Sequence, residues 1–328
     1  MHVVADSFND AYNKLALGLR DEPEFEAAPR GMKVKETLAA SFKIKNPRHR
    51  MIFNKARRFK PQYTIAETLW YLSGNNSTEW IGKYAPFWLH ISDDGKTANS
   101  AYGARIFKPN NTIAGGRFSQ WDWIKDELTR DPDSRRAVIH IKSPADSLDA
   151  KLDVPCTLTL QFLIRDHKLH MIVNMRSSDL ILGIANDVPA FTLFQELLAL
   201  ELGVGLGDYN HTSGSLHVYE KHWSMLDKLC DPQSLLSSAA DTEIFGPQPA
   251  MPSVPPIGTL MWYETKLAGI DTIAELNDLL TNLKIDEYWA NWVRALASYR
   301  ARELGDLTLT KKLVSAGWHC KLDHTNTQ

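Results

Sequence analysis

The hydrophobic pattern in the centre of the chain constrains the fold more than any other feature. β-Branched and aromatic residues dominate 136–142 (RAVIHIK), 157–166 (TLTLQFLIRD) and 168–176 (KLHMIVNMR), which predicts three strands. His167 alone separates the last two segments, so they are predicted to form a hairpin of an antiparallel sheet. Residues 188–202 (VPAFTLFQELLALEL) are apolar nearly all round, which is typical of a buried helix. Strands packed on a buried helix indicate an α+β fold.

The spacing of apolar residues elsewhere indicates how the rest of the chain is organised. A strand is predicted at 216–223 (LHVYEKHW), and helices are predicted at 6–20, 64–73, 119–130, 273–284 and 286–303. Residues 75–116 are loop-rich. Residues 231–258 are rich in Pro and Ser and predict a surface excursion. Because little chain follows this excursion, we expect one domain over 1–328 with a C-terminal elaboration from about 231.

The composition excludes several classes of protein. The 328 residues are 44% hydrophobic, which is ample for a buried core. Lys and Arg number 37 and Asp and Glu number 39, giving a formal net charge of −2. Such a balance does not favour a nucleic-acid polymer or a membrane surface as partner. No run approaches the roughly 18 apolar residues of a spanning helix, and the N-terminus lacks the pattern of a signal peptide.

The three cysteines, Cys156, Cys230 and Cys320, are too few and too widely spaced to predict a disulfide framework or a zinc site. They fit a reducing compartment, so we expect a cytoplasmic location (the host cytoplasm for a phage protein) and no metal. Cys156 follows Pro155 and precedes a predicted strand. Its simplest interpretation is a small buried apolar residue. Nearby arginines could instead lower the pKa of its thiol and make it a nucleophile.

Basic and hydroxyl side chains gather near the ends of the predicted strands. The pair Arg135–Arg136 begins one strand, and each could simply be a surface charge. Arg176 and Ser177 end another strand, and a guanidinium beside hydroxyls suits a phosphate. Asn186–Asp187 precedes the buried helix, where its default interpretation is an N-cap. Together, a thiol, several arginines, a serine and an acidic side chain predict a site for a nucleotide monophosphate.

Ordered motifs across the same region resemble the thymidylate synthase family. They are PC (155–156), LIRD (163–166), RSSD (176–179) followed by LILG, then Asp187, and GSLHVYEKH (214–222). The match runs from about Arg30 to His222, over half of the chain. It implies a three-layer α+β fold with a central, mostly antiparallel sheet and a long buried helix. It also implies an obligate homodimer whose active sites are shared across the interface.

The resemblance assigns roles to individual residues. Cys156 matches the nucleophile, and the other matches to catalytic positions are Glu67, Tyr102 and Asp187. The implied nucleotide-binding residues are Arg30, Arg176 and Ser177 for the phosphate, Arg135 and Arg136 for the phosphate of the other subunit, His217 and Tyr219 for the ribose, and Asp179 and Asp187. The implied folate-binding residues are Glu67, Trp88 and Asp179.

Two positions depart from the thymidylate synthase pattern. Thr157 stands where a histidine normally follows the cysteine. Asp187 stands eight residues after Asp179, where the family reads uracil with an asparagine. With LIRD and VNMRS, these departures resemble the deoxycytidylate (dCMP) hydroxymethylase branch. The exchange has a physical reason, because cytosine presents an N4 donor and an N3 acceptor. A carboxylate accepts from N4, and a shared proton can bridge to N3.

This branch implies a covalent mechanism with 5,10-methylenetetrahydrofolate as carbon donor. The Cys156 thiolate, favoured by nearby arginines, attacks C6, and C5 then attacks the methylene carbon. Loss of the C5 proton and of the folate amine leaves an exocyclic methylene, to which water adds to give 5-hydroxymethyl-dCMP. Glu67 would orient water or relay protons. The polar end of the chain, CKLDHTNTQ, favours water over hydride, because family synthases close the site with a short apolar C-terminus.

The sequence leaves three alternatives open. The enzyme could methylate dUMP or dCMP, as thymidylate synthases do with uracil. It could act on CMP, as in nucleoside-antibiotic biosynthesis, although the Arg135–Arg136 and RSSD segments resemble the deoxycytidylate branch. The same fold could also serve a non-catalytic nucleotide or RNA binder. The intact thiol and phosphate set and the lack of a basic stripe argue against that last interpretation.

Overall fold

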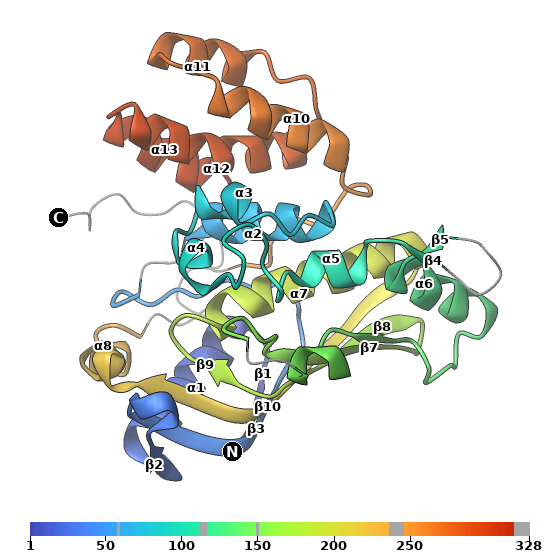
Figure 1. Cartoon of the computed structure of the whole chain (residues 1–328), viewed down its shortest axis with the longest axis vertical. Helices are drawn as coiled ribbons and strands as arrows, with labels where there is room; N and C mark the ends of the chain where they lie inside the picture. Colours follow the sequence, from blue (N-terminus) through green and yellow to red (C-terminus); the bar gives the residue numbers. More distant parts are fainter. Residues whose placement is uncertain (58–59, 112–116, 149–150, 236–245, 318–328) are drawn as a thin grey trace.

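The computed structural model describes residues 1–57, 60–111, 117–148, 151–235 and 246–317. Figure 1 shows these residues in layers, with a sheet at the bottom and α7 (Ile184–Leu202) across one face of it. α2 (Pro61–Leu72) lies above α7, and the C-terminal helices lie above α2. Within the described ranges, no helix is both long and apolar enough to cross a membrane. The layers confirm the predicted α+β class.

The main sheet has eight strands, six of them in the order β1–β3–β10–β8–β7–β6. β10 (Gly205–Tyr219) is antiparallel to β3 (Val34–Ile44) and parallel to β8 (Lys168–Met175). The other strands are β1 His2–Ala5, β2 Phe25–Ala27, β6 Val138–His140, β7 Thr157–Arg165 and β9 Ser178–Asp179, with β4 Asn110–Asn111 and β5 Arg117–Phe118 as a separate pair. β3 and the first half of β10 escape the sequence prediction, because Gly, Ser, Thr and Lys dilute their apolar alternation.

β7 and β8 form the predicted hairpin. Its loop residues Asp166 and His167 have φ values of 50° and 56°, the left-handed backbone that a two-residue hairpin loop requires. β6 is shorter than predicted and covers only Val138–His140. The Arg136 amide donates to the Ser134 hydroxyl at 3.1 Å instead of to a neighbouring strand. In the register of the hairpin, the first residue of β7 is Thr157, which pairs with Met175. β7 therefore begins directly after the candidate nucleophile Cys156.

α7 begins four residues before the predicted start at 188, and this corrects the interpretation of Asp187. Pro189 suggests a start near 188, because proline favours the first helical turn. The N-cap is instead Gly183, and the Asp187 amide donates to the Gly183 carbonyl at 3.0 Å. The predicted N-cap at Asn186–Asp187 is therefore wrong. The Asp187 side chain is available for another role.

Before residue 231 the structure contains the predicted helices and several short helices that the sequence does not predict. α1 (Phe8–Asp21) and α6 (Gln120–Arg130) begin after the capping side chains of Ser7 and Ser119. The loop-rich region holds three short helices, α3 Thr78–Gly82, α4 Phe87–Ile91 and α5 Tyr102–Ile106. The predicted strand 216–223 ends at Tyr219, where the short helices η3 Glu220–His222 and α8 Trp223–Leu229 take over.

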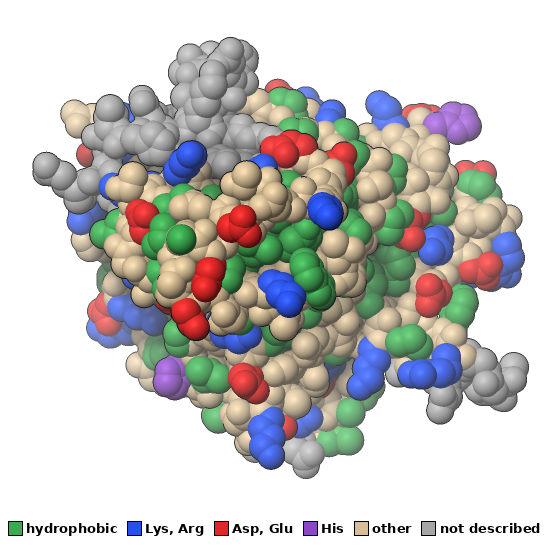
Figure 2. Space-filling model, turned by 90° about the horizontal axis from the view of Figure 1, so that it is seen from above, with side chains coloured by type: hydrophobic (Ala, Val, Ile, Leu, Met, Phe, Trp, Pro, Cys, Tyr) green, Lys and Arg blue, Asp and Glu red, His purple; other side chains and the backbone are tan. Residues whose placement is uncertain are grey.

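Between residue 256 and the end of the described chain at 317 there are four helices, where the sequence predicts two. They are α10 Ile257–Ala268, α11 Ile273–Thr281, α12 Glu287–Glu303 and α13 Leu307–Gly317. α10, α12 and α13 pack against α2. Figure 2 views the molecule from this helical end, where acidic and basic side chains are interspersed. Because these helices share a buried core with the sheet, we propose that the chain is one domain with a C-terminal elaboration.

The predicted surface excursion at 231–258 is partly wrong. Residues 236–245 lie outside the described part of the chain. Downstream of them, Gln248 and Met251 are buried, and the Gln248 amide donates to the Arg48 carbonyl at 2.9 Å. The Pro-rich composition therefore describes an extended segment that packs on the body of the protein.

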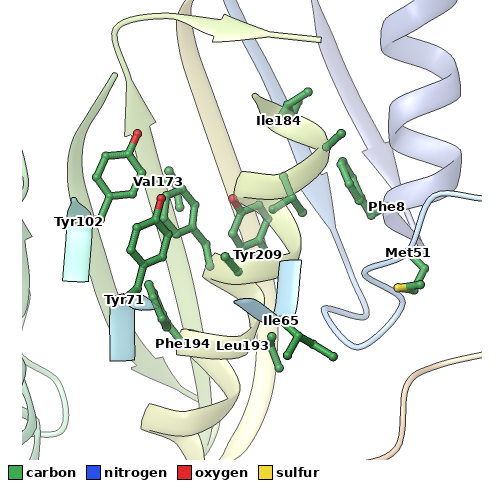
Figure 3. Close-up of a cluster of buried hydrophobic side chains, with 14 of the residues drawn as sticks. Phe8, Met51, Ile65, Tyr71, Tyr102, Val173, Ile184, Leu193, Phe194 and Tyr209 are labelled. Carbon is green, nitrogen blue, oxygen red and sulfur yellow. The ribbon is translucent and has the colours of Figure 1, made fainter. Parts of the chain in front are cut away.

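A connected apolar core joins α2, α7 and the sheet. Figure 3 shows part of this cluster, in which the ring of Tyr71 lies between Tyr102 and Phe194. Tyr71 stacks on Tyr102 with ring centroids 5.3 Å apart and meets Phe194 edge-on at 6.3 Å. This packing fixes the helices that carry Glu67 and Asp187 relative to each other.

A buried ion pair ties α7 to segments far away in the sequence. The fully buried Arg50 guanidinium donates to Glu196 at 2.5 Å, and the other Glu196 oxygen accepts from the Met251 amide at 2.9 Å. Glu196→Gln should leave the Arg50 charge buried without its counter-ion, and breaking such a pair typically costs about 3–5 kcal/mol. We expect a loss of this size in the free energy of unfolding measured in urea.

The matched control for this prediction is Glu303→Gln. Its partner Arg300 lies at 2.8 Å in an exposed pair, and exposed pairs contribute only about 0–1 kcal/mol. Equal unfolding free energies for the two variants would contradict a stabilising role for the buried pair.

Candidate active site

Cys156 lies in the turn directly before β7, and Arg176 organises that turn. The Arg176 guanidinium donates to the carbonyls of Pro155 and Val154, both at 2.9 Å. The Arg176 amide donates to the Cys156 carbonyl, also at 2.9 Å. The thiol itself is partly buried. Arg176 thus holds the cysteine at the start of β7, beside the end of β8, where Thr157 pairs with Met175.

The electrostatics of Cys156 correct one expectation. Burial raises the pKa of its thiol, Arg176 lowers it, and Asp187 raises it again, so that the net pKa lies above the ordinary value. Arg30 acts in the same direction as Arg176 but more weakly. The arginines therefore do not generate a standing thiolate. The proton has to leave the thiol when the nucleophile reacts, and a neighbouring group must be able to receive it.

Glu67 lies on α2 and is held by two tyrosines from the same helix. Its Oε1 accepts from the Tyr63 hydroxyl at 2.8 Å and from the Tyr71 hydroxyl at 3.2 Å. The Tyr63 oxygen in turn accepts from the indole Nε1 of Trp88 at 3.1 Å. The other carboxyl oxygen, Oε2, is buried without a hydrogen-bond partner among the described residues. An unpartnered buried oxygen marks a place for a ligand or water.

Burial is the main cause that raises the pKa of Glu67 to about 8, and the charge of Asp187 adds to it. The bonds from Tyr63 and Tyr71 act in the opposite direction. At neutral pH Glu67 is therefore mostly protonated. It can give up a proton during a reaction and take it back.

Asp187 is the second carboxyl with a shifted pKa. Burial raises the pKa to about 7, with a smaller contribution from the negative charge of Asp179. Its position on the first turn of α7 lets its charge act on Glu67, Tyr102 and Cys156. Asp187 thus exchanges between the carboxylate and the carboxylic acid near neutral pH. Perturbed carboxyls of this kind concentrate at functional sites.

Tyr102 completes the cluster at the start of α5. It is 7% exposed, and burial, followed by the charge of Asp187 and then of Cys156, raises the pKa of its hydroxyl well above the ordinary value. The hydroxyl therefore stays protonated and can donate. The four predicted catalytic residues come from four separate elements: Cys156 before β7, Glu67 on α2, Tyr102 on α5 and Asp187 on α7.

The predicted phosphate and ribose residues lie beside this cluster. Arg30, in the short helix η1 (Pro29–Gly31), has a left-handed φ of 54° and is exposed. His217 and Tyr219 end β10 with their rings edge-on, 5.1 Å apart. Ser177 is half-buried and directly follows Arg176. Arg30 and Arg176 act on the thiol by lowering its pKa, and His217 lies beside Asp179 in the pairing of β10 with β9.

Asp179 lies at the turn before α7, and the pair Arg135–Arg136 lies outside the Cys156 cluster. Asp179 Oδ1 accepts from the amides of Ile181 and Leu182, at 2.7 and 3.1 Å, and so shapes the turn that leads into α7. Arg135 and Arg136 are exposed on the segment before the edge strand β6. No described contact joins either side chain to the Cys156 cluster.

Charge effects within one chain link Cys156 to Arg30, Arg176 and Asp187. They also link Asp187 to Glu67 and Tyr102. Among the described residues, no such link reaches the arginine pair.

Comparisons with known proteins show the family and the fold of this chain. A family model described as thymidylate synthase matches residues 11–238. The chain belongs to the thymidylate synthase family. A solved member of this family, thermostable thymidylate synthase A from Bacillus subtilis, shares the fold with a TM-score of 0.59 and 23% identity, over 70% of this chain and 86% of that one. The three-layer thymidylate synthase fold expected from the motifs is confirmed.

Two phage relatives within the thymidylate synthase family are more similar in sequence. Deoxyuridylate hydroxymethyltransferase of Bacillus phage SP01 is 36% identical over 200 residues, which span 58% of this chain but only 52% of that protein. Deoxycytidylate 5-hydroxymethyltransferase of Enterobacteria phage T4 is 31% identical over 238 residues, 69% of this chain and 92% of that protein. The two names differ in the base, so the comparisons leave the choice of base open.

Tyr63 and Tyr71 are site residues that the sequence prediction misses. They lie four residues before and four residues after Glu67 on α2, a spacing that places all three on one helical face. That spacing is visible in the sequence. In a buried helix, however, it indicates core packing just as well as hydrogen bonding to an acid.

Proposed function

We propose that this chain transfers a one-carbon unit from 5,10-methylenetetrahydrofolate to C5 of a cytosine nucleotide, dCMP, and that water addition yields 5-hydroxymethyl-dCMP. The observation that carries the choice of base is Asp187, whose pKa is raised to about 7. Its carboxylate can accept from the exocyclic N4 of cytosine. Its carboxylic acid can share a proton with N3, which an asparagine amide cannot do.

The arrangement supports a covalent route through Cys156. Its sulfur would bond to C6, and electron density from the C5–C6 double bond would move toward C5 and N3. The Asp187 proton at N3 would stabilise that density. When bound, the folate supplies the methylene carbon that C5 acquires. After water addition, the Cys156 sulfur would leave C6 as the thiolate, which restores the C5–C6 double bond and releases the product. The charges of Asp187 and Cys156 act on Tyr102, and the charge of Asp187 acts on Glu67. We infer that Glu67 and Tyr102 relay protons during the reaction.

Glu67 is suited to hold the water that would add to the exocyclic methylene. Its Oε1 is fixed by Tyr63 and Tyr71, which leaves the unpartnered Oε2 to hold a water. A carboxyl with a pKa near 8 can orient that water and exchange a proton with it. The polar C-terminus that also favours water lies outside the described residues. We infer the reducing cytoplasm as the compartment, because the nucleophile has to remain a free thiol.

The experiment that tests this function supplies methylenetetrahydrofolate with dCMP, CMP, dUMP or UMP and identifies the products by mass spectrometry. We expect turnover with dCMP and a product that carries a hydroxymethyl group. A product lighter by one oxygen would indicate reductive methylation. Preference for CMP would move the enzyme to ribonucleotides. Nucleotide binding without turnover in all four mixtures would remove the catalytic proposal.

Arg135 and Arg136 motivate a proposal about assembly. Both are exposed and away from the cluster of their own chain, as expected if they complete the phosphate site of a second subunit in a homodimer. Mixing Cys156→Ala chains with Arg136→Ala chains should then restore activity. Each hybrid dimer has one site with both changes and one with neither, so random exchange predicts about a quarter of wild-type activity.

The control for this mixing experiment is each variant alone, which should stay inactive under the same conditions. Exchange between subunits is verified by mass-labelled chains. Proven exchange without any recovery of activity would contradict shared sites.

A further inference from the structure

The C-terminal helices lie beyond the part of the chain that matches the family, yet they contact the wall of the site. The family match ends at 238, and α10 begins at Ile257. α10 and α12 pack on α2, the helix of Glu67. In Figure 1 the orange and red C-terminal helices cover the blue and cyan α2 and α3 from above. This cover therefore faces the side of α2 that is turned away from the sheet.

One buried carboxylate joins the two parts. Glu264 on α10 is 3% exposed and accepts three hydrogen bonds from the short segment 80–84. The donors are the indole Nε1 of Trp80 at 3.0 Å, the hydroxyl of Tyr84 at 3.1 Å and the Lys83 ammonium at 3.4 Å. Three donors from one short segment leave that segment little freedom. Lys83 also supplies the opposite charge that a buried carboxylate needs.

A second contact fixes the same segment from α12. The ring of Tyr299 meets the ring of Tyr84 edge-on at 4.7 Å, and the Tyr299 hydroxyl donates to the Tyr84 carbonyl at 3.3 Å. Burial, and then the charge of Glu264, raises the pKa of Tyr84 well above its ordinary value, so that its hydroxyl remains a donor. The segment is thus held by two C-terminal helices at once.

The fixed segment leads directly into the site. α4 begins at Phe87, and its Trp88 is 8% exposed and donates to the Tyr63 oxygen at 3.1 Å. Tyr63 donates onward to Glu67 at 2.8 Å. A displacement of the segment 80–84 would move Trp88 and so withdraw the support of the Tyr63 hydroxyl. Continuous contacts thus join Glu264 to the carboxyl that faces the reaction.

We propose that Glu264 is a positioning residue, through which the C-terminal helices hold Trp88 and Tyr63 on the folate side of the site. This inference rests on the proposed function for its kinetic consequence. Its structural part, the restraint of residues 80–91 by Glu264, is independent of any activity.

The test compares the full chain with Glu264→Ala, Glu264→Gln and Glu287→Ala. Glu287 is the matched control, because it is an exposed acid of the same helical cover that pairs with Arg294 at 2.5 Å. For Glu264→Ala we expect the KM for methylenetetrahydrofolate to rise about tenfold, with the KM for dCMP unchanged within about twofold. Glu264→Gln keeps one acceptor oxygen and should recover part of the loss. Glu287→Ala should match wild type.

A merely structural role gives a different pattern. Loss of folded protein would lower kcat in proportion to the folded fraction and leave both KM values unchanged, which would overturn the proposal.

Hydrogen exchange followed by mass spectrometry provides a readout without turnover. We expect faster exchange in 80–91 for Glu264→Ala and no change for Glu287→Ala. If the wild-type protein shows no turnover, the proposed function fails. Hydrogen exchange then tests the restraint of residues 80–91 by itself. Unchanged exchange in 80–91 would refute it.

Discussion

Cys156→Ala is expected to abolish turnover while leaving nucleotide binding largely intact. The substitution removes only the sulfur that would bond to C6, and the phosphate and ribose side chains around it keep their places. The turn before β7 is held by Arg176 through backbone carbonyls, so it does not depend on the cysteine side chain. Loss of a covalent nucleophile typically costs several orders of magnitude in rate.

The measurement for Cys156→Ala pairs kcat with the dissociation constant of dCMP. Cys230→Ala is the matched control, because Cys230 is the other described free cysteine and caps α8 inside the core. We expect Cys230→Ala to keep its turnover. Residual turnover of Cys156→Ala above about a hundredth of wild type would contradict a covalent mechanism, since a lost nucleophile should cost far more.

Asp187→Asn is expected to weaken use of the cytosine nucleotide and improve use of the uracil nucleotide. An amide can donate to O4 of uracil and accept from its N3–H, but it has no proton to share with N3 of cytosine. A mismatched buried polar pair costs about 1–3 kcal/mol. The preference should therefore shift by roughly tenfold to a hundredfold for each contact that is inverted.

The ratio of kcat/KM for dCMP and dUMP measures this shift directly. Asn186→Ala is the control, because the Asn186 side chain donates to the Leu182 carbonyl at 2.9 Å inside the first turn of α7. It should leave the ratio of the two kcat/KM values unchanged. An unchanged ratio in Asp187→Asn would remove the main reason for assigning cytosine and return the enzyme to the uracil branch.

The local elements and the order of the motifs could be predicted from the amino-acid sequence. The apolar runs around His167 and along 188–202 predicted the hairpin and the buried helix, because side-chain period reflects which face of a strand or helix is buried. The motifs from Arg30 to His222 named Cys156, Glu67, Tyr102 and Asp187 as one site. Local pattern could not place the start of α7 or predict β3, since Pro189 and polar strand residues gave misleading or weak signals.

The protonation behaviour of these residues depends on the folded protein. The raised pKa values of Glu67, Asp187 and Cys156 result from burial and from carboxyls that meet across different elements. Such shifts depend on distance and exposure, which have no counterpart in linear spacing. The same holds for Glu264, which is an ordinary acid of α10 in the sequence. It gains its place only because the C-terminal helices fold back onto α2 and enclose it with donors from 80–84.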